Sequence, residues 1–155
     1  MHYWLMKSEP GECSIDDALA APKQTVPWTG VRNYQARNFM RDAMRTGDGV
    51  LFYHSSCPQP GIAGIAEVAS APYSDATQFD ARSKYHDAAA TRDQPRWAHV
   101  DVRALKKTRL VPIAELRAHQ ALAGMWLLRR GNRLSITPVT KAEWNFITRT
   151  LLKTP

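Results

Sequence analysis

"VLFYHS" (residues 50–55) and "GIAGIAEVAS" (residues 61–70) are the stretches that decide the fold. Both are short apolar runs, and Pro58 and Pro60 lie in the turn that separates them. Apolar runs bounded by turn residues are typical of buried strands, and two such runs close together in sequence predict a hairpin. We therefore take this hairpin as the centre of the fold and place the other elements around it.

Before the hairpin, the sequence predicts a strand at "HYWLMK" (residues 2–7) and a short helix at "SIDDALAA" (residues 14–21), where Ser14 and Asp17 form a capping box. Asn33 is positioned to cap a second helix. The apolar residues of that helix recur at helical spacing, and they are Ala36, Phe39, Met40, Ala43 and Met44. We expect these side chains to face the core.

After the hairpin, residues 73–95 are polar and predict an irregular excursion. Further elements are predicted at "WAHVDVRAL" (97–105, strand), "RLVPIAELRAHQAL" (109–122, strand end and helix), "GNRLSITPV" (131–139, strand) and "TKAEWNFITRTLL" (140–152, helix). Thr140 and Glu143 form the capping box of the last helix. Five or so strands with short helices between them predict an α+β chain built on a small mixed or barrel-like sheet.

Length and composition favour a single globular domain over residues 1–155. Hydrophobic residues make up 44% and charged residues 23%, and the formal net charge of +7 favours a polyanionic partner. No apolar run is long enough to span a bilayer, and the start of the chain lacks the pattern of a signal peptide. We therefore expect a cytoplasmic protein with no membrane partner, in which Cys13 and Cys57 are reduced thiols.

Motifs for catalysis, metals and cofactors are missing from the sequence. It contains no GxSxG, HExxH, Gly-rich phosphate loop or CxxC pair, and its histidines are scattered. His54 is followed by Ser55 and Ser56, so a Ser/His pair is conceivable, but without a recognisable acid a loop histidine is the favoured interpretation. We predict no catalytic residue, no metal site and no cofactor.

Arginines recur at helical spacing in the second predicted helix. Arg37, Arg41 and Arg45 lie at i, i+4 and i+8, so they share one face. This face is either a stripe that follows phosphates or a solvated surface favoured by the helix dipole. Arg129, Arg130 and Arg133 form a second basic cluster that admits the same two interpretations.

Trp28 and Gly30 come just before the second helix, in "PWTGVRNYQARNFM" (residues 27–40). Free N–H donors concentrate at a helix N-terminus, and a flat ring beside them suits a planar ligand such as a nucleobase. Packing of Trp28 on the helix as a hydrophobic staple is the alternative, and spacing alone slightly favours it.

Several segments together resemble the EVE domain family. They are "YWLMKSEP" (3–10), "WTGVRNYQARN" (28–38), "GDGVLFYHS" (47–55), "GIAGIAEV" (61–68), "PRWAHVDV" (95–102) and "LLRRGNRLSI" (127–136). They follow the family's order and cover nearly the whole chain. The resemblance implies a PUA-like fold, which is a small bent β-barrel of about five to six strands with flanking short helices.

EVE domains are similar to YTH domains, which enclose N6-methyladenine of RNA in an aromatic cage. The resemblance places Trp28 at a cage position, and Tyr73, Phe79, Tyr85 or Trp97 would supply a second aromatic wall. The base-binding residues that it implies are Lys7, Ser8, Trp28, Gly30, Val31, Asn33, Tyr53, His54, Ser55 and Trp97. Those expected at phosphates are Arg32, Arg37, Arg129 and Arg133.

The resemblance thus implies a binding module that reads a methylated or hydroxymethylated base in DNA or RNA. An alternative is a small hydrolase of modified nucleosides, because related ASCH-type proteins resemble amidohydrolases. Lys7, Glu9, Tyr53 and His54 would then supply acid and base chemistry. An adaptor role would depend on the last helix alone, and core packing explains the apolar pattern of that helix more simply.

Overall fold

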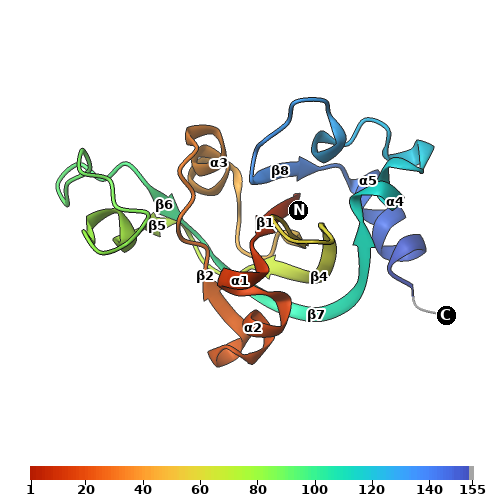
Figure 1. Ribbon diagram of the computed structural model, residues 1–155, viewed down its shortest axis with the longest axis horizontal. Coiled ribbons are helices and arrows are strands. Elements are labelled where there is room, and N and C mark those ends of the chain that lie inside the picture. The colour runs from red at the N-terminus through yellow and green to blue at the C-terminus, as the bar shows by residue number, and fades with distance from the viewer. Residues whose placement is uncertain (154–155) are drawn as a thin grey trace.

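The computed structural model describes residues 1–153 and contains one six-stranded and one two-stranded sheet (Figure 1). The strands are β1 (Tyr3–Ser8), β2 (Thr25–Pro27), β3 (Gly49–His54), β4 (Gly61–Val68), β5 (Tyr73–Ser74), β6 (Ala98–His99), β7 (Asp101–Pro112) and β8 (Ile136–Val139). The α-helices are α1 (Pro10–Cys13), α2 (Ile15–Ala20), α3 (Tyr34–Asn38), α4 (Ile113–Arg117) and α5 (Lys141–Phe146). Single 3₁₀ turns are η1 (Pro22–Gln24), η3 (Ala76–Phe79), η4 (Gln120–Leu122) and η5 (Trp126–Leu128), and π-helical turns are η2 (Phe39–Ala43) and η6 (Ile147–Leu151).

The predicted hairpin is confirmed and lies in the middle of the larger sheet. The strand order is β2-β7-β4-β3-β1-β8, and β1 runs parallel to β3 while the other neighbours are antiparallel. Register shifts occur between Phe52 and Tyr53 in the β3–β4 pair and at two places between β4 and β7. Such irregularities bend a sheet, and Figure 1 shows β7 as a long curved strand. Six strands agree with the expectation, but within residues 1–153 the sheet is open rather than a closed barrel.

Both faces of the central strands are buried, which explains why their sequences are continuously apolar. Trp4 and Met6 of β1 and Phe52 of β3 lie in one core cluster, whereas Leu5 and Leu51 lie in a second one. Helices α2 and α3 cover the first cluster, and α4, α5 and η6 cover the second. Side chains alternate across a strand, so consecutive apolar residues fill two cores instead of one.

The two predicted capping boxes are confirmed. Ser14 and Asp17 exchange hydrogen bonds with each other's backbone at the start of α2, and Thr140 and Glu143 do the same at α5. Asn33 caps α3 as expected, and its side chain accepts from the backbone N–H of Ala36 at 3.0 Å. Caps satisfy local backbone donors, so short-range sequence predicts them well.

The second helix differs from its prediction after Asn38, where the π-helical turn η2 begins. Each π turn holds about one residue more than an α turn, because its hydrogen bonds run from i to i+5. The Met44 N–H accordingly donates to the Phe39 carbonyl. Ala43 is therefore exposed instead of buried, while Met40 and Met44 stay in the core. The strand expected over residues 131–139 is also shorter than predicted, since only Ile136–Val139 pair with β1.

The polar excursion after β4 is organised by the two-stranded sheet, in which Tyr73 pairs with His99. Residues 75–97 between these strands form η3 and a series of turns. Figure 1 shows this green segment extending to the left, away from the larger sheet. Residues 73–97 are called the excursion below.

Candidate nucleic-acid interface

A cavity of about 610 Å³ opens where the end of β1, the loop before α3 and the excursion meet. Its lining residues are Lys7, Ser8, Glu9, Glu12, Cys13, Val26, Pro27, Trp28, Thr29, Gly30, Val31, Arg32, Ser55, Ser56, Tyr85, Arg133 and Ser135. Ligand cavities commonly measure about 300–1,000 Å³, so this one has the size of a small-molecule site. It mixes two aromatic rings with charged and hydroxyl side chains.

Eight residues expected at the site from the sequence line this cavity together. They are Lys7, Ser8, Trp28, Gly30, Val31, Ser55, Arg32 and Arg133. The parallel pairing of β1 with β3 brings Lys7 and Ser8 close to Ser55. The Ser55 N–H donates to the Ser8 carbonyl at 2.9 Å. Gly30 and Val31 belong to the loop that leads into α3. Segments far apart in sequence thus converge on one cavity.

Tyr53 and His54 lie outside the cavity lining, although they end β3 and directly precede Ser55 in the chain. The Tyr53 side chain is buried in the second core cluster. His54 Nε2 accepts the backbone N–H of Ile15 at 3.0 Å, which holds the start of α2 against β3. Burial lowers the pKa of His54, and this favours the neutral ring that accepts that bond.

Asn33 and Trp97 are also placed elsewhere. The Asn33 side chain caps α3. Trp97 is buried, stacks on Tyr34 with the ring centroids 4.8 Å apart, and donates its indole N–H to Asp87 at 2.8 Å. Of the four aromatic residues considered for the second wall, Tyr85 is the one that lines the cavity.

Trp28 has a double role in the structure. Trp28 lines the cavity, yet its exposed fraction is only 7% and its ring packs in a T-shaped arrangement with Phe52 at a centroid distance of 5.3 Å. The two interpretations of this residue, a staple in the core and a platform at a site, are therefore compatible. A substitution at Trp28 would affect stability as well as the cavity.

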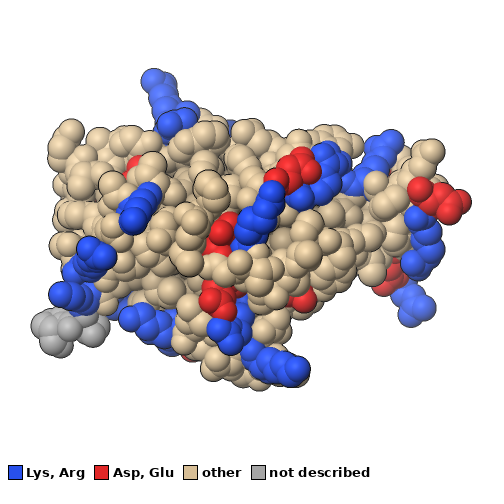
Figure 2. Space-filling view, turned by 180° about the vertical axis from the view of Figure 1, so that it is seen from behind, with Lys and Arg blue, Asp and Glu red and all other residues tan. Residues whose placement is uncertain are grey.

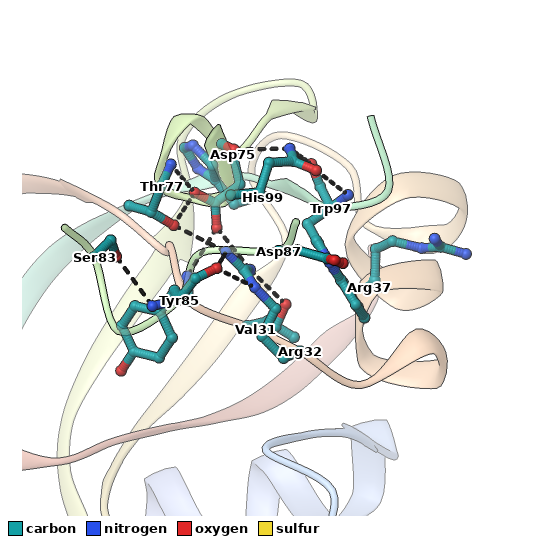
Figure 3. Close-up of polar contacts among 12 residues, drawn as sticks. Val31, Arg32, Arg37, Asp75, Thr77, Ser83, Tyr85, Asp87, Trp97 and His99 are labelled. Carbon is teal, nitrogen blue, oxygen red and sulfur yellow. Dashed lines mark hydrogen bonds and ion pairs between the residues drawn. The ribbon is translucent and has the colours of Figure 1, made fainter. Parts of the chain in front are cut away.

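Arg32 links the loop before α3 to the excursion (Figure 3). Its Nε and Nη2 donate to the Tyr85 carbonyl at 2.9 and 2.6 Å, Nη2 also donates to Thr77 Oγ1, and Nη1 pairs with Asp75 at 3.1 Å. The guanidinium also lies 5.6 Å from the ring centre of Tyr85. Because protein groups accept these hydrogen bonds, the Arg32 guanidinium stabilises the wall of the cavity.

Asp75 is the acceptor at the centre of this network, and its side chain is only 1% exposed. It accepts from the Gly30 N–H at 2.8 Å and from the Thr77 N–H and hydroxyl at 2.9 and 2.6 Å. Burial acts to raise the pKa of the Asp75 carboxyl, but the hydrogen bonds from Thr77, Gly30 and Arg32 outweigh it and lower the pKa. Asp75 is therefore held as a carboxylate.

Tyr85 forms the cavity wall that the excursion contributes. Its ring packs on Gly30, where a Cβ atom would lie 2.7 Å from ring carbons of Tyr85, and Gly30 has a φ of +85°. Only glycine suits that conformation and that close approach. The Tyr85 hydroxyl donates to the two carboxylate oxygens of Glu12 at 2.9 and 2.7 Å, and Lys84 pairs with the same carboxylate.

Lys7 is the charged donor at the end of β1. Burial lowers the pKa of its ammonium group, which lies 6.0 Å from the ring centre of Tyr53. Within residues 1–153, no carboxylate pairs with Lys7 and no side chain or backbone group hydrogen-bonds to its Nζ. An acceptor on a ligand would satisfy a donor that the protein leaves unpaired.

The remaining arginines differ in the contacts that they make with other protein groups. Arg37 donates to the Arg96 carbonyl at 2.6 Å and to Asn38, and it lies 4.6 Å from the ring centre of Tyr34. Arg129 is exposed and lies over the Trp126 ring. Arg133 is exposed and lines the cavity. On the face opposite to that of Figure 1, basic side chains are scattered among acidic ones instead of forming one patch (Figure 2).

The four residues of the alternative hydrolase are not brought together. Lys7 and Glu9 line the cavity, but Tyr53 and His54 do not. In residues 1–153 no group of three or more His, Cys, Asp or Glu side chains is arranged to hold a metal ion. The same residues contain no helix with the length and apolar character needed to cross a membrane.

Sequence reasoning missed Glu12 and Asp75 as determinants of this cavity, and it gave Tyr85 only as one of four candidates for the second wall. Glu12 lies in the short helix α1, and the other two lie in a segment without periodicity. Gly30 gave a signal, because a glycine in a loop can mark a close approach of the backbone to another group. The identity of that group could not be read from local sequence.

The EVE domain family matches residues 2–150 of the chain. Thymocyte nuclear protein 1 of Homo sapiens is 44% identical over 94% of this chain and 72% of its own length. A solved structure of a protein from Pseudomonas putida is 49% identical, with a TM-score of 0.90, and covers 95% of this chain and 97% of the other. The human THYN1 protein in complex with DNA containing 5-methylcytosine is 42% identical, with a TM-score of 0.93, over all of both chains. The chain therefore belongs to the EVE domain family.

Proposed function

We propose that this protein is a non-catalytic nucleic-acid-binding module that takes one modified base, foremost 5-methylcytosine of DNA, into the cavity beside Trp28. The observation that carries the proposal is the likeness, over the full length of both chains, to the human THYN1 protein in complex with DNA containing 5-methylcytosine. The cavity supports it because it offers aromatic rings together with polar groups at a size that admits a base.

The side chains of the cavity fit the parts of a nucleobase. Trp28 and Tyr85 supply apolar ring surface, and stacking on an aromatic ring contributes roughly 1–3 kcal/mol per base. Lys7, Ser8 and Ser55 supply hydrogen-bonding groups for the polar edge of the base. A methyl group that fills apolar volume adds on the order of 1 kcal/mol, which is the expected basis for preferring the modified base.

Phosphate contacts are assigned to the exposed arginines beside the cavity. Arg133 lines it, and Arg129 lies on the same loop. Arg32 and Arg37, which the sequence also suggested, have their donors directed at protein groups, so in this proposal they position the excursion. Taking a base out of a duplex costs a few kcal/mol, so single-stranded or mismatched sites are the preferred targets.

RNA is the other nucleic acid that the family resemblance allows, with N6-methyladenine as its modified base. We also propose that the protein is cytoplasmic and that Trp28 and Tyr85 together form the aromatic cage. The choice between DNA and RNA depends on the sugar, because a 2′-hydroxyl distinguishes the two at a given site. A test must therefore vary the base and the sugar separately.

The experiment is a binding titration at two salt concentrations. The ligands are single-stranded DNA and RNA of one sequence that carry cytosine, 5-methylcytosine, adenine or N6-methyladenine at the centre. We expect 5-methylcytosine DNA to bind about fivefold more tightly than cytosine DNA, as one buried methyl group predicts. This ratio should not change with salt, whereas all affinities should fall as salt rises.

Variants connect the result to the cavity. Lys7→Met removes the unpaired donor and should weaken the binding of all the oligonucleotides. The control, Lys106→Gln, removes an equal charge from an exposed position outside the cavity. Lys106→Gln should leave the preference for the methylated base unchanged. Equal affinity for all bases in the wild type, with binding abolished by salt, would refute the proposal.

A further inference from the structure

The carboxylate of Glu12 is the acidic group that reaches the cavity in a fixed position. It accepts hydrogen bonds from the Tyr85 hydroxyl through both oxygens, and Lys84 pairs with Oε1. Tyr85 is itself held by Gly30 beneath its ring and by Arg32 at its carbonyl. A surface glutamate ordinarily samples many rotamers, so this arrangement restricts Glu12 to one edge of the cavity.

Glu12 retains the capacity to accept a further hydrogen bond. A carboxylate offers about four lone-pair positions, and the contacts with Tyr85 and Lys84 leave part of these free. Lys7, whose ammonium has no hydrogen-bond partner within residues 1–153, lines the same cavity. The cavity therefore presents an acceptor at one position and a donor at another.

An acceptor together with a donor is complementary to the hydrogen-bonding edge of cytosine but not to that of thymine. Cytosine carries an amino donor on C4 and acceptors at N3 and O2, whereas thymine carries a carbonyl acceptor on C4 and a donor at N3. Thymine has the same C5 methyl group as 5-methylcytosine, so a methyl-sized apolar space cannot distinguish the two bases. Any reader of 5-methylcytosine needs a polar group that rejects thymine.

We propose that Glu12, positioned by Tyr85, is the specificity-determining acceptor that selects the 4-amino group of a cytosine-type base and excludes thymine. This inference depends on the proposed function, because it concerns the base held in the same cavity. Against thymine, the Glu12 carboxylate would face the C4 carbonyl, and two acceptors in contact form no hydrogen bond and repel each other. Lys7 would donate to N3 or O2 of the selected base.

The test separates the methyl group from the amino group by using four ligands. Single-stranded DNA of one sequence carries cytosine, 5-methylcytosine, uracil or thymine at the central position. The ratio of affinities between methylated and unmethylated partners reports the proposed function. The ratio between 5-methylcytosine and thymine reports the role of Glu12.

Glu12→Gln is the informative variant, because an amide can turn either its oxygen or its nitrogen toward C4 and so accepts or donates. We expect the preference for 5-methylcytosine over thymine to fall roughly tenfold, since a hydrogen bond to a charged group is replaced by an ambivalent one. Tyr85→Phe removes the hydroxyl that fixes Glu12 and should lower the same ratio by a smaller factor. Asp16→Asn, at an exposed acid outside the cavity that pairs with Lys107, is the matched control and should change nothing.

The outcomes discriminate between the two proposals. If the methyl preference persists while Glu12→Gln leaves the ratio of 5-methylcytosine to thymine intact, Glu12 is only a structural partner of Tyr85 and the inference is overturned. If the wild type shows no methyl preference at all, the proposed function fails, and the inference fails with it. Thermal melting of each variant shows whether a lost ratio comes from recognition or from unfolding.

Discussion

In the β3–β4 hairpin, the residues that hold the chain in place are apolar, whereas in the excursion they are polar and bond to distant parts of the sequence. Residues 49–53 of β3 are all buried, and Phe52 is among the largest fully buried side chains. In the excursion the buried groups include Asp75 and Gln78, whose side chains bond to Gly30, Arg32, Arg96 and Trp97. The hairpin builds the scaffold, and the excursion adds one wall of the cavity to it.

The hairpin and the excursion should therefore open separately. Apolar burial is shared by many neighbours, so its loss is felt by the whole sheet. A network centred on one carboxylate can be released while the sheet stays folded, because local units of a protein open with different free energies.

Phe52→Ala should have the largest effect, because it removes a fully buried ring that also packs against Trp28. We expect a loss of about 3–5 kcal/mol in the free energy of unfolding, as for other aromatic residues removed from a core. Chemical denaturation measures it. Leu105→Ala, at a side chain that is 43% exposed, serves as the control and should cost far less. Equal losses at both positions would refute the assignment of Phe52 to the scaffold.

Asp75→Asn should release the excursion and leave the sheet intact. An amide presents an NH₂ group to the donors of Gly30, Thr77 or Arg32, so at least one hydrogen bond is replaced by a donor-donor contact. We expect a local cost of about 2–3 kcal/mol. Hydrogen exchange should become faster in residues 75–97 but not in β3 and β4. Asp93→Asn, at an exposed acid of the same segment, is the control.

Protonation of Asp75 at low pH should release the excursion as Asp75→Asn does. The pKa of Asp75 in the folded protein is lowered, so its contribution to stability is fully present above the unfolded value of about 3.9. That contribution is lost as the pH falls through the lower pKa of the folded state. Exchange rates in residues 75–97 should therefore rise below about pH 4. Asp75→Asn should remove this dependence on pH, and a variant that keeps it would show that another acid is responsible.

Arg37→Gln should have the smallest effect of the series. It deletes the hydrogen bond from Arg37 to the Arg96 carbonyl, which connects α3 to the end of the excursion near the surface. We expect a cost of about 0.5–1 kcal/mol, seen as slightly faster exchange near residue 97. A loss as large as that of Asp75→Asn would mean that the surface contact, rather than the buried carboxylate, anchors the excursion.

Much of the scaffold could be predicted because its signals are local. The hairpin, both capping boxes and the Asn33 cap each depend on residues within a few positions of one another. The π-helical turn at Phe39 was missed, and with it the exposure of Ala43, because the same apolar spacing fits an α-helix. Whether the sheet stays open or closes into a barrel depends on pairing between strands far apart in sequence, and local patterns do not report such pairing.

The candidate site was predictable only in part, for the same reason. Lys7, Ser8, Trp28 and Gly30 meet because β1 and β3 run parallel and the loop before α3 returns to them. Whether a residue at the end of a strand lines this cavity or packs into a core depends on register, and the Tyr53 side chain lies in the second core cluster and not among the lining residues. The contact between Tyr85 and Glu12 joins residues 73 positions apart, and nothing near either residue announces it.

The most direct test of the central claim, that a modified base enters the cavity beside Trp28, is to map chemical shifts of the backbone amides. Single-stranded DNA with one 5-methylcytosine is compared with the same DNA carrying cytosine. We predict that the amides of Ser8, Gly30 and Ser55 differ most between the two complexes. Identical shifts for both ligands, confined to exposed lysines and arginines away from the cavity, would contradict the claim.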